Sequence, residues 1–156
     1  MNIQDPQCVI LLHGLARTAH AMKKMEKALG NTGYTVVNQG YPSTKQDIQS
    51  LAAETLPKAL AKCPATGTIH FVTHSMGGIL LRQFLAKHEI EKLGRVVMMA
   101  PPNGGSEIVD RLGGLALFEA LNGPAGLELG TGNQSLPNRL GAITFEAGIK
   151  SSFARF

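Results

Sequence analysis

The sequence contains no uninterrupted apolar run of about 18 residues, the length that a membrane-spanning helix requires. We therefore expect no integral membrane segment. Residues 1–6 (MNIQDP) also lack the basic region followed by an apolar stretch that marks a secretory signal peptide. On this ground the sequence predicts a cytoplasmic protein.

Aromatic residues make up only 5% of the chain, and no arginine-rich arm is present. The formal net charge of +4 therefore comes without the stacking side chains and the basic stripe that nucleic-acid binding needs. The tightest basic group, Lys23, Lys24 and Lys27, falls on a predicted helix, where a solvated face explains it better. We expect no nucleic-acid partner.

Cysteine is almost absent as well. Cys8 and Cys63 are too few for a disulfide framework and lack metal-ligand spacing, so we expect no metal site. Two buried thiols are one interpretation of this pair. The two residues also fall near the start of a predicted strand and the end of a predicted helix, which can meet at one edge of a sheet. A disulfide is therefore the alternative, and it would favour an oxidising compartment.

The remaining composition is that of an ordinary globular domain: 156 residues, 44% hydrophobic and 17% charged. Four short apolar runs rich in β-branched residues are bounded by glycine or proline. Runs that are apolar almost throughout are typical of strands buried on both faces of a parallel sheet. The runs are residues 8–12, 34–37, 68–73 and 95–100, with the predicted strand segments at 9–12, 35–37, 69–72 and 96–99.

Segments with apolar residues at helical spacing separate these runs, at residues 22–29, 48–60 and about 77–87. Thr44 and Asp47 precede the second segment and can form a capping box. Alternating strands and helices predict an α/β fold: a parallel sheet with helices on both faces.

The amino-acid composition changes after residue 100. Residues 101–142 contain many glycines and prolines, but also two apolar stretches, at 107–112 and 115–121. This segment is too apolar for a linker, and we expect it to lie as a partly helical cap over the C-terminal ends of the strands. Residues 143–149 have the pattern of a further strand. The whole chain, residues 1–156, is interpreted as one domain.

The chemically informative segment is residues 73–78 (THSMGG), which follows an apolar strand and precedes an apolar helix. A strand-to-helix turn this sharp exposes its central serine above the sheet, and it needs small residues two positions before and after. Gly77 meets that need, whereas Thr73 stands where glycine is expected. The alternative interpretation of Ser75 is an ordinary helix N-cap.

A second segment, residues 9–15 (VILLHGL), is a predicted strand that ends in His13 and Gly14. An acyl-transfer enzyme needs backbone N–H groups aimed at the developing oxyanion. We expect one from Met76, the residue after the serine, and the other from Leu15, because Gly14 lets the chain turn closely. His13 is expected to brace this loop rather than to act as a base.

Three segments carry a resemblance to a known family: residues 11–15 (LLHGL), 73–78 (THSMGG) and 100–106 (APPNGGS). Together they resemble the lipase/esterase branch of the α/β-hydrolases, particularly small bacterial lipase-like members, over residues 8–149. The resemblance implies hydrolysis of a small-molecule carboxylic ester, with Ser75 as nucleophile, Leu15 and Met76 as oxyanion-hole residues, and no cofactor or metal. Substrate contacts are expected from the oxyanion loop and from apolar cap residues: His13, Gly14, Leu112, Leu115, Phe118 and Leu121.

The sequence departs from this family in the catalytic triad, which runs serine, acid and histidine in chain order. The only histidine after Ser75 is His88, and thirteen helical residues would place it about 20 Å away. Glu107 and Asp110 are candidates for the acid, although the family's acid commonly follows a later strand. We therefore interpret the chain as a hydrolase fold incomplete at its C-terminus, and we expect weak ester hydrolysis or none.

Other functional classes are compatible with parts of this sequence. The main alternative is a non-catalytic module that keeps the hydrolase fold and binds an acyl ligand or a protein; the missing downstream histidine favours it. A nucleotide-binding protein would need a glycine-rich phosphate motif after the first strand, which residues 13–18 (HGLART) do not supply. The natural substrate, the choice among ester, thioester and amide, and the oligomeric state are left open.

Overall fold

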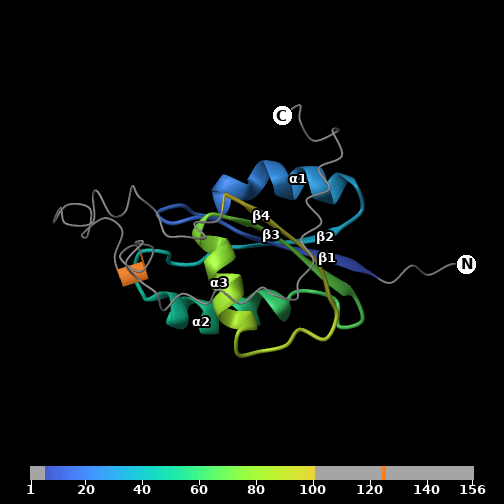
Figure 1. Ribbon diagram of the computed structural model, residues 1–156. Helices are drawn as coiled ribbons and strands as arrows, with labels where there is room; N and C mark the ends of the chain where they lie inside the picture. The colour runs from blue at the N-terminus through green and yellow to red at the C-terminus, as the bar shows by residue number, and fades with distance from the viewer. Residues whose placement is uncertain (1–5, 101–123, 126–156) are drawn as a thin grey trace, which may run out of the picture.

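The computed structural model describes residues 6–100 and 124–125, and its strands form a single parallel sheet (Figure 1). The strand order is β2-β1-β3-β4. Each of the four predicted strand segments lies within one of these strands, so the predicted α/β architecture is confirmed. The strands are β1 (Gln7–Leu12), β2 (Thr35–Gln39), β3 (Thr68–His74) and β4 (Leu93–Met99).

Helices cover both faces of the sheet. In Figure 1, one helix lies above the sheet and two lie together below it. Within the described residues, no helix is long and apolar enough to cross a membrane. The helices are α1 (Lys23–Asn31), which a 3-10 turn, η1 (Ala19–Met22), leads into, α2 (Ile48–Leu60) and α3 (Met76–Leu85).

Alternate side chains of the central strand β1 enter two separate apolar clusters. Cys8, Ile10 and Leu12 belong to the larger cluster, which lies between the sheet and the helices α2 and α3. Val9 and Leu11 belong to the smaller cluster, which packs beneath α1. All five side chains are at least 97% buried, since the most exposed of them, Val9, has a relative exposure of 3%. Burial on both faces explains why this strand is apolar throughout instead of alternating.

The start of α2 differs from the prediction. Asp47 is itself the N-cap: one carboxylate oxygen accepts the backbone N–H of Ser50 at 2.8 Å, and the other accepts the Ser50 hydroxyl at 2.8 Å. The hydrogen bonds from Ser50 lower the pKa of the Asp47 carboxyl. The capping box predicted from Thr44 and Asp47 is therefore wrong, because Asp47 takes the position that the box assigns to Thr44.

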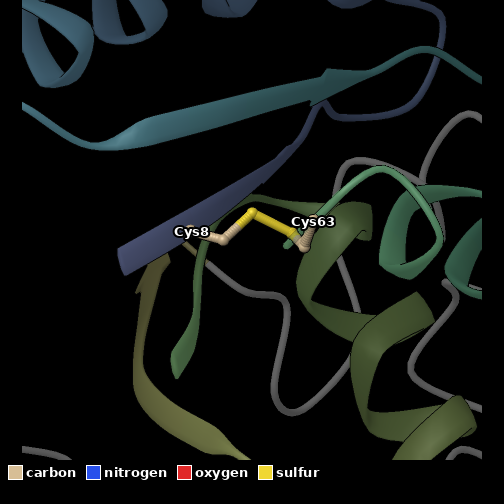
Figure 2. The surroundings of a disulfide bond; sticks show 2 residues. All are labelled: Cys8 and Cys63. Atoms are coloured by element: carbon tan, nitrogen blue, oxygen red, sulfur yellow. A yellow bond between two sulfur atoms is a disulfide. The ribbon is translucent and has the colours of Figure 1, made fainter. Parts of the chain in front are cut away.

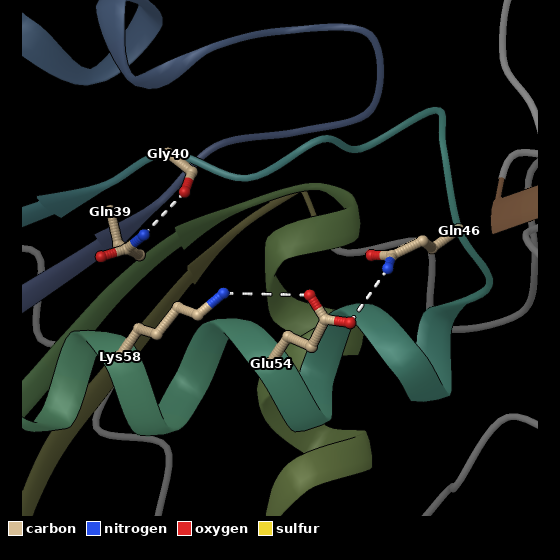
Figure 3. A network of polar contacts seen from close by, with 5 residues as sticks. All are labelled: Gln39, Gly40, Gln46, Glu54 and Lys58. Atoms are coloured by element: carbon tan, nitrogen blue, oxygen red, sulfur yellow. Dashed lines mark hydrogen bonds and ion pairs between the residues drawn. The ribbon is translucent and has the colours of Figure 1, made fainter.

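Polar contacts on α2 restrain the loop that joins β2 to it (Figure 3). Glu54 accepts a hydrogen bond from the Gln46 side chain at 3.0 Å and pairs with Lys58 at 3.9 Å. The exposed ion pair adds at most about 0.5 kcal/mol, but the Gln46 bond fastens the end of the loop to the helix. At the other end, the Gln39 side chain donates to the carbonyl of Gly40 at 2.7 Å.

The two cysteines form a disulfide (Figure 2). Cys8 near the start of β1 is bonded to Cys63 just beyond α2, with 5.8 Å between their Cα atoms. The sequence left two buried thiols and a disulfide open as interpretations, and the structure confirms the disulfide. Because disulfides persist mainly in oxidising environments, the bond favours such a compartment. The cytoplasmic location stays a prediction, and this bond argues against it.

A β-bulge between β3 and β4 is completed by a histidine ring. The extra residue in β4 places Gly94 and Arg95 opposite His70 alone. The backbone N–H of Arg95 donates to Nδ1 of His70 at 2.8 Å, and Nε2 lies 2.6 Å from the Gln7 side-chain oxygen. A backbone N–H can only donate, so Nδ1 is unprotonated and the proton is on Nε2. The ring therefore replaces the backbone acceptor that the bulge removes.

This bulge predicts a loss of stability in acid. Burial, and then the charge of Arg95, lower the pKa of His70, which also faces Gln7 and the edge of the Tyr34 ring. Below about pH 6.5, the ordinary pKa of a histidine, the unfolded chain binds more protons at this position than the folded chain does, so the free energy of unfolding decreases as the pH falls. Urea unfolding between pH 8 and pH 5 should show a shallower decline in His70→Asn than in the parent. Equal declines would contradict this account.

Candidate active site

Ser75 occupies a strained turn between β3 and α3. Its backbone angles are φ 50° and ψ −119°, in the region that non-glycine residues rarely adopt. The sharp strand-to-helix turn predicted at Ser75 is therefore present, and it strains the backbone of this residue. Ser75 stands at the N-cap position of α3, but its side chain makes no capping hydrogen bond, and its backbone is not in the extended region usual for a cap. An ordinary helix cap does not account for this serine.

Backbone strain gathers at one end of the sheet. Among the described residues, the non-glycine residues with positive φ are Ala16 (52°), Ser75 (50°) and Ala100 (46°). They follow the C-terminal ends of β1, β3 and β4 respectively. Such strain tends to collect where a fold holds a functional site. Open α/β sheets bind ligands at this same end.

Gly77 allows the close approach of α3 to β1 on which the turn depends. A Cβ at Gly77 would lie 2.7 Å from the carbonyl oxygen of Leu12 and 2.9 Å from that of His13. These are backbone atoms of the central strand β1 and of the residue that follows it, and they cannot move aside as a flexible side chain can. The close contact with β1 is therefore the reason why the residue two positions after the serine must be small, and Gly77 meets this requirement.

The adjacent glycine explains why threonine is tolerated two positions before the serine. Thr73 is fully buried, and a Cβ at Gly78 would lie 3.2 Å from its Oγ1 and 3.2 Å from Sδ of Met98. The space that a glycine at residue 73 would leave is thus provided from the helix side, at residue 78. The departure from the expected pattern has a structural compensation.

The loop after β1 reaches the serine turn at Gly14, which is buried. A Cβ added there would lie 3.3 Å from Cβ of Ser75 and 2.9 Å from Nδ1 of the exposed His74. Two segments that are about sixty residues apart in the chain therefore meet, as the sequence predicted. The side chain of His74 lies against Gly14.

The two expected oxyanion donors lie on these two segments. Met76 is the first residue of α3, and the first N–H groups of a helix have no acceptor within it. Leu15 lies in a turn, and among the backbone hydrogen bonds of the described residues its N–H takes no part. The N–H of Ser75 differs, because it donates to the carbonyl of Met99 at 2.9 Å. Leu15 and Met76 therefore remain the candidates, and their role stays a prediction.

His13 is buried and forms a compact unit with Tyr41, a residue that sequence reasoning missed. The two rings stack with centroids 4.0 Å apart and planes 9° apart. Nδ1 of His13 lies 2.8 Å from the carbonyl oxygen of Gly14. Burial lowers the pKa of His13 and raises that of the Tyr41 phenol, so both side chains are neutral. The only sequence signal is a tyrosine that lies four residues after the strand predicted at 35–37 and directly before a proline.

None of the five histidines hydrogen bonds to Ser75 within the described part of the chain, which contains all five. His13 and His70 use both ring nitrogens elsewhere. His88 lies beyond the far end of α3, where its ring stacks on Phe84 at 4.5 Å. The two others, His20 and His74, are exposed.

Several predicted residues lie outside the described part of the chain. The strand predicted at residues 143–149 is among them. Within the cap segment predicted at residues 101–142, only Pro124 and Ala125 are described; they are helical, and Ala125 is fully buried in the cluster under α2 and α3. The cap stays a prediction. The cap and acid candidates that lie outside are Leu112, Leu115, Phe118, Leu121, Glu107 and Asp110.

The sequence matches no family model and no curated protein. Solved structures do match. The mature form of Bacillus licheniformis lipase BlEst2 is 22% identical with a TM-score of 0.62, over 89% of this chain and 63% of the lipase. The phospholipase PlaB of Legionella pneumophila is 20% identical with a TM-score of 0.63, over 82% of this chain and 33% of that protein.

A metagenomic carboxyl esterase, MGS0156, is 20% identical with a TM-score of 0.62, over 86% of this chain and 43% of the esterase. The chain thus spans less than two thirds of the length of these structures. Identities this low establish the fold alone. The parallel sheet in the order β2-β1-β3-β4, the helices on both faces and these matches together show that the chain has the α/β-hydrolase fold of lipases and esterases.

Proposed function

We propose that this chain acts on carboxylic esters, with Ser75 as its nucleophile. The observation that carries the proposal is the positive φ of Ser75 at the turn between β3 and α3. A serine without a capping bond gains nothing for the helix from this conformation, which costs about 1–3 kcal/mol. A nucleophile that must stand clear of the sheet gives the strain a purpose. The non-catalytic alternative leaves it without one.

The proposed reaction is acyl transfer to serine followed by hydrolysis. Oγ of Ser75 bonds to the ester carbonyl carbon while the hydroxyl proton passes to a base, and the carbonyl oxygen gains negative charge. The N–H groups of Leu15 and Met76 donate to that oxygen. The bond to the alcohol oxygen then breaks, and the alcohol leaves with a proton. Water next attacks the acyl-serine, which releases the carboxylic acid and restores the hydroxyl.

The substrate class is suggested by the structural neighbours, which are named as a lipase, a phospholipase and a carboxyl esterase. An ester of a carboxylic acid is the chemistry these names share. The expected acyl contacts at Leu112, Leu115, Phe118 and Leu121 are part of this proposal. Slow turnover is also part of this proposal, because all five histidines lie in the described residues and none of them bonds to Ser75.

An activated ester tests both the assignment of Ser75 as nucleophile and the slow turnover. With p-nitrophenyl butyrate, the 156-residue chain should acquire one butyryl group, detected by intact mass, and Ser75→Ala should acquire none. Steady turnover should stay near the residual acceleration of about 10³–10⁴ over water that oxyanion donors and binding supply without a working triad. No adduct, with equal hydrolysis by parent and variant, would refute the nucleophile. Rapid turnover that Ser75→Ala abolishes would reveal a base, supplied by this chain or by a second subunit.

A further inference from the structure

Tyr41 contacts His13 in three ways. Its backbone N–H donates to Nε2 of His13 at 3.3 Å, its phenol hydroxyl donates to the His13 carbonyl oxygen, and its ring stacks on the imidazole. Both residues are buried, with relative exposures of 8% for Tyr41 and 0% for His13. Tyr41, two residues beyond the end of β2, therefore holds both the ring and the backbone of His13.

These contacts fix the protonation of His13. The backbone N–H of Tyr41 can only donate, so Nε2 of His13 must be its acceptor and carries no proton. In the neutral ring the proton is then on Nδ1, which donates to the carbonyl oxygen of Gly14 at 2.8 Å. The contact between Tyr41 and Nε2 thus makes Nδ1 a donor to Gly14.

Fixing two carbonyl groups also fixes two N–H groups. A peptide unit is planar and trans, so its C=O and N–H point in opposite directions. The Tyr41 hydroxyl holds the carbonyl of His13, which sets the direction of the Gly14 N–H. Nδ1 of His13 holds the carbonyl of Gly14, which sets the direction of the Leu15 N–H. Two consecutive peptide planes beside Ser75 are therefore held through one tyrosine.

We propose that Tyr41 is a positioning residue for the oxyanion hole, acting through His13 to aim the Leu15 N–H. The inference rests on the proposed function, because it assumes that Leu15 donates to an oxyanion. Oxyanion donors act strongly only when their direction is set before the reaction begins. A glycine loop has little stiffness of its own, so an outside restraint at Gly14 is needed.

The loop that carries Tyr41 is itself held. The N–H of Ser43 donates to the carbonyl of Tyr41 at 2.9 Å, and Gln46 is bonded to Glu54 on α2 (Figure 3). Burial raises the pKa of the Tyr41 phenol, so its hydroxyl remains a donor throughout the neutral and alkaline range in which esterase assays are run. The restraint on Gly14 therefore originates in a fixed part of the fold.

Tyr41→Phe tests the part of this role that the hydroxyl carries. It releases the His13 carbonyl, and with it the peptide plane that precedes the Gly14–Leu15 plane, and it keeps the stacked ring and the backbone N–H. Tyr34→Phe is the matched control at the only other tyrosine, which lies before β2 against His70. In amide-resolved NMR spectra, the Gly14 and Leu15 signals should shift or broaden in Tyr41→Phe, while Met76 keeps its signal. Gly14 and Leu15 signals identical to those of the parent would overturn the proposal, since a purely structural tyrosine changes stability without redirecting these groups.

The reaction of Ser75 with a fluorophosphonate supplies the kinetic readout. Tyr41→Phe should lower the maximal labelling rate constant about tenfold at unchanged half-saturating probe, less than the roughly 100-fold loss expected when an oxyanion donor is removed. Equal rate constants in parent and variant would also overturn the proposal. If the parent is not labelled at all, the proposed function fails, and the amide signals still decide whether Tyr41 holds the loop. His13→Asn, which keeps a side-chain N–H but offers no ring to stack, should likewise disturb the Leu15 signal.

Discussion

Removing the Cys8–Cys63 disulfide should lower the free energy of unfolding by about 2–4 kcal/mol. The bond joins residues 55 positions apart, so its reduction releases a long loop in the unfolded chain. It also ties the central strand β1, where Cys8 is fully buried, to the end of α2. Urea unfolding of the oxidised and the reduced protein measures the difference directly.

The control is the double variant Cys8→Ala with Cys63→Ala. It cannot form the bond, so its unfolding midpoint should not respond to reductant, and it should unfold close to the reduced parent apart from the small cavity at residue 8. Thiol titration of the unfolded, unreduced parent should detect no free thiol, which would establish that the bond is present. Two free thiols in protein oxidised in air, or equal midpoints with and without reductant, would contradict the contribution assigned to this disulfide.

Gly77→Ala should disrupt the turn that carries Ser75. The added Cβ would lie 2.7 Å and 2.9 Å from two carbonyl oxygens of β1 and the residue after it, and α3 must move away to relieve the overlap. Overpacking of this kind costs about 1–3 kcal/mol. Because the movement occurs two residues from Ser75, acylation by p-nitrophenyl butyrate should fall by about 100-fold, as for a reacting group displaced by about 1 Å.

Gly30→Ala is the matched control for this substitution. Gly30 lies within α1, and a Cβ there would have no atom within 4 Å. Alanine should therefore raise stability by about 0.5–1 kcal/mol and leave the reactivity of Ser75 unchanged. If Gly77→Ala behaves like Gly30→Ala in both measurements, the close packing of α3 on β1 does not hold the turn at Ser75.

Local sequence patterns were enough to predict the sheet and the serine turn. A strand buried on both faces must be apolar throughout, and β1 is, so a strand of a parallel sheet covered on both faces could be predicted from residues 8–12. A serine between an apolar strand and an apolar helix, followed by Gly77, specifies a sharp turn by steric need. Both features depend on residues that are neighbours in the chain.

Individual side-chain contacts between residues distant in the chain could not be predicted. Tyr41 and His13 are 28 positions apart, and nothing local marks a tyrosine that will donate to a particular carbonyl. His70 meets the Arg95 N–H only because a bulge shifts the register of β4 by one residue. The disulfide was left open for the same reason, since spacing alone does not fix the distance between Cys8 and Cys63.

The reactivity of Ser75 toward a fluorophosphonate, in the presence and absence of imidazole, tests the central claim most directly. We expect a slow adduct that peptide mapping places on Ser75. We also expect acceleration by imidazole acting as a base, because none of the five histidines, all of which the structure describes, bonds to Ser75. Ser75→Ala and urea-unfolded parent should form no adduct. An adduct on another residue, or labelling of the folded parent no faster than that of the unfolded chain, would contradict the assignment of Ser75 as the nucleophile.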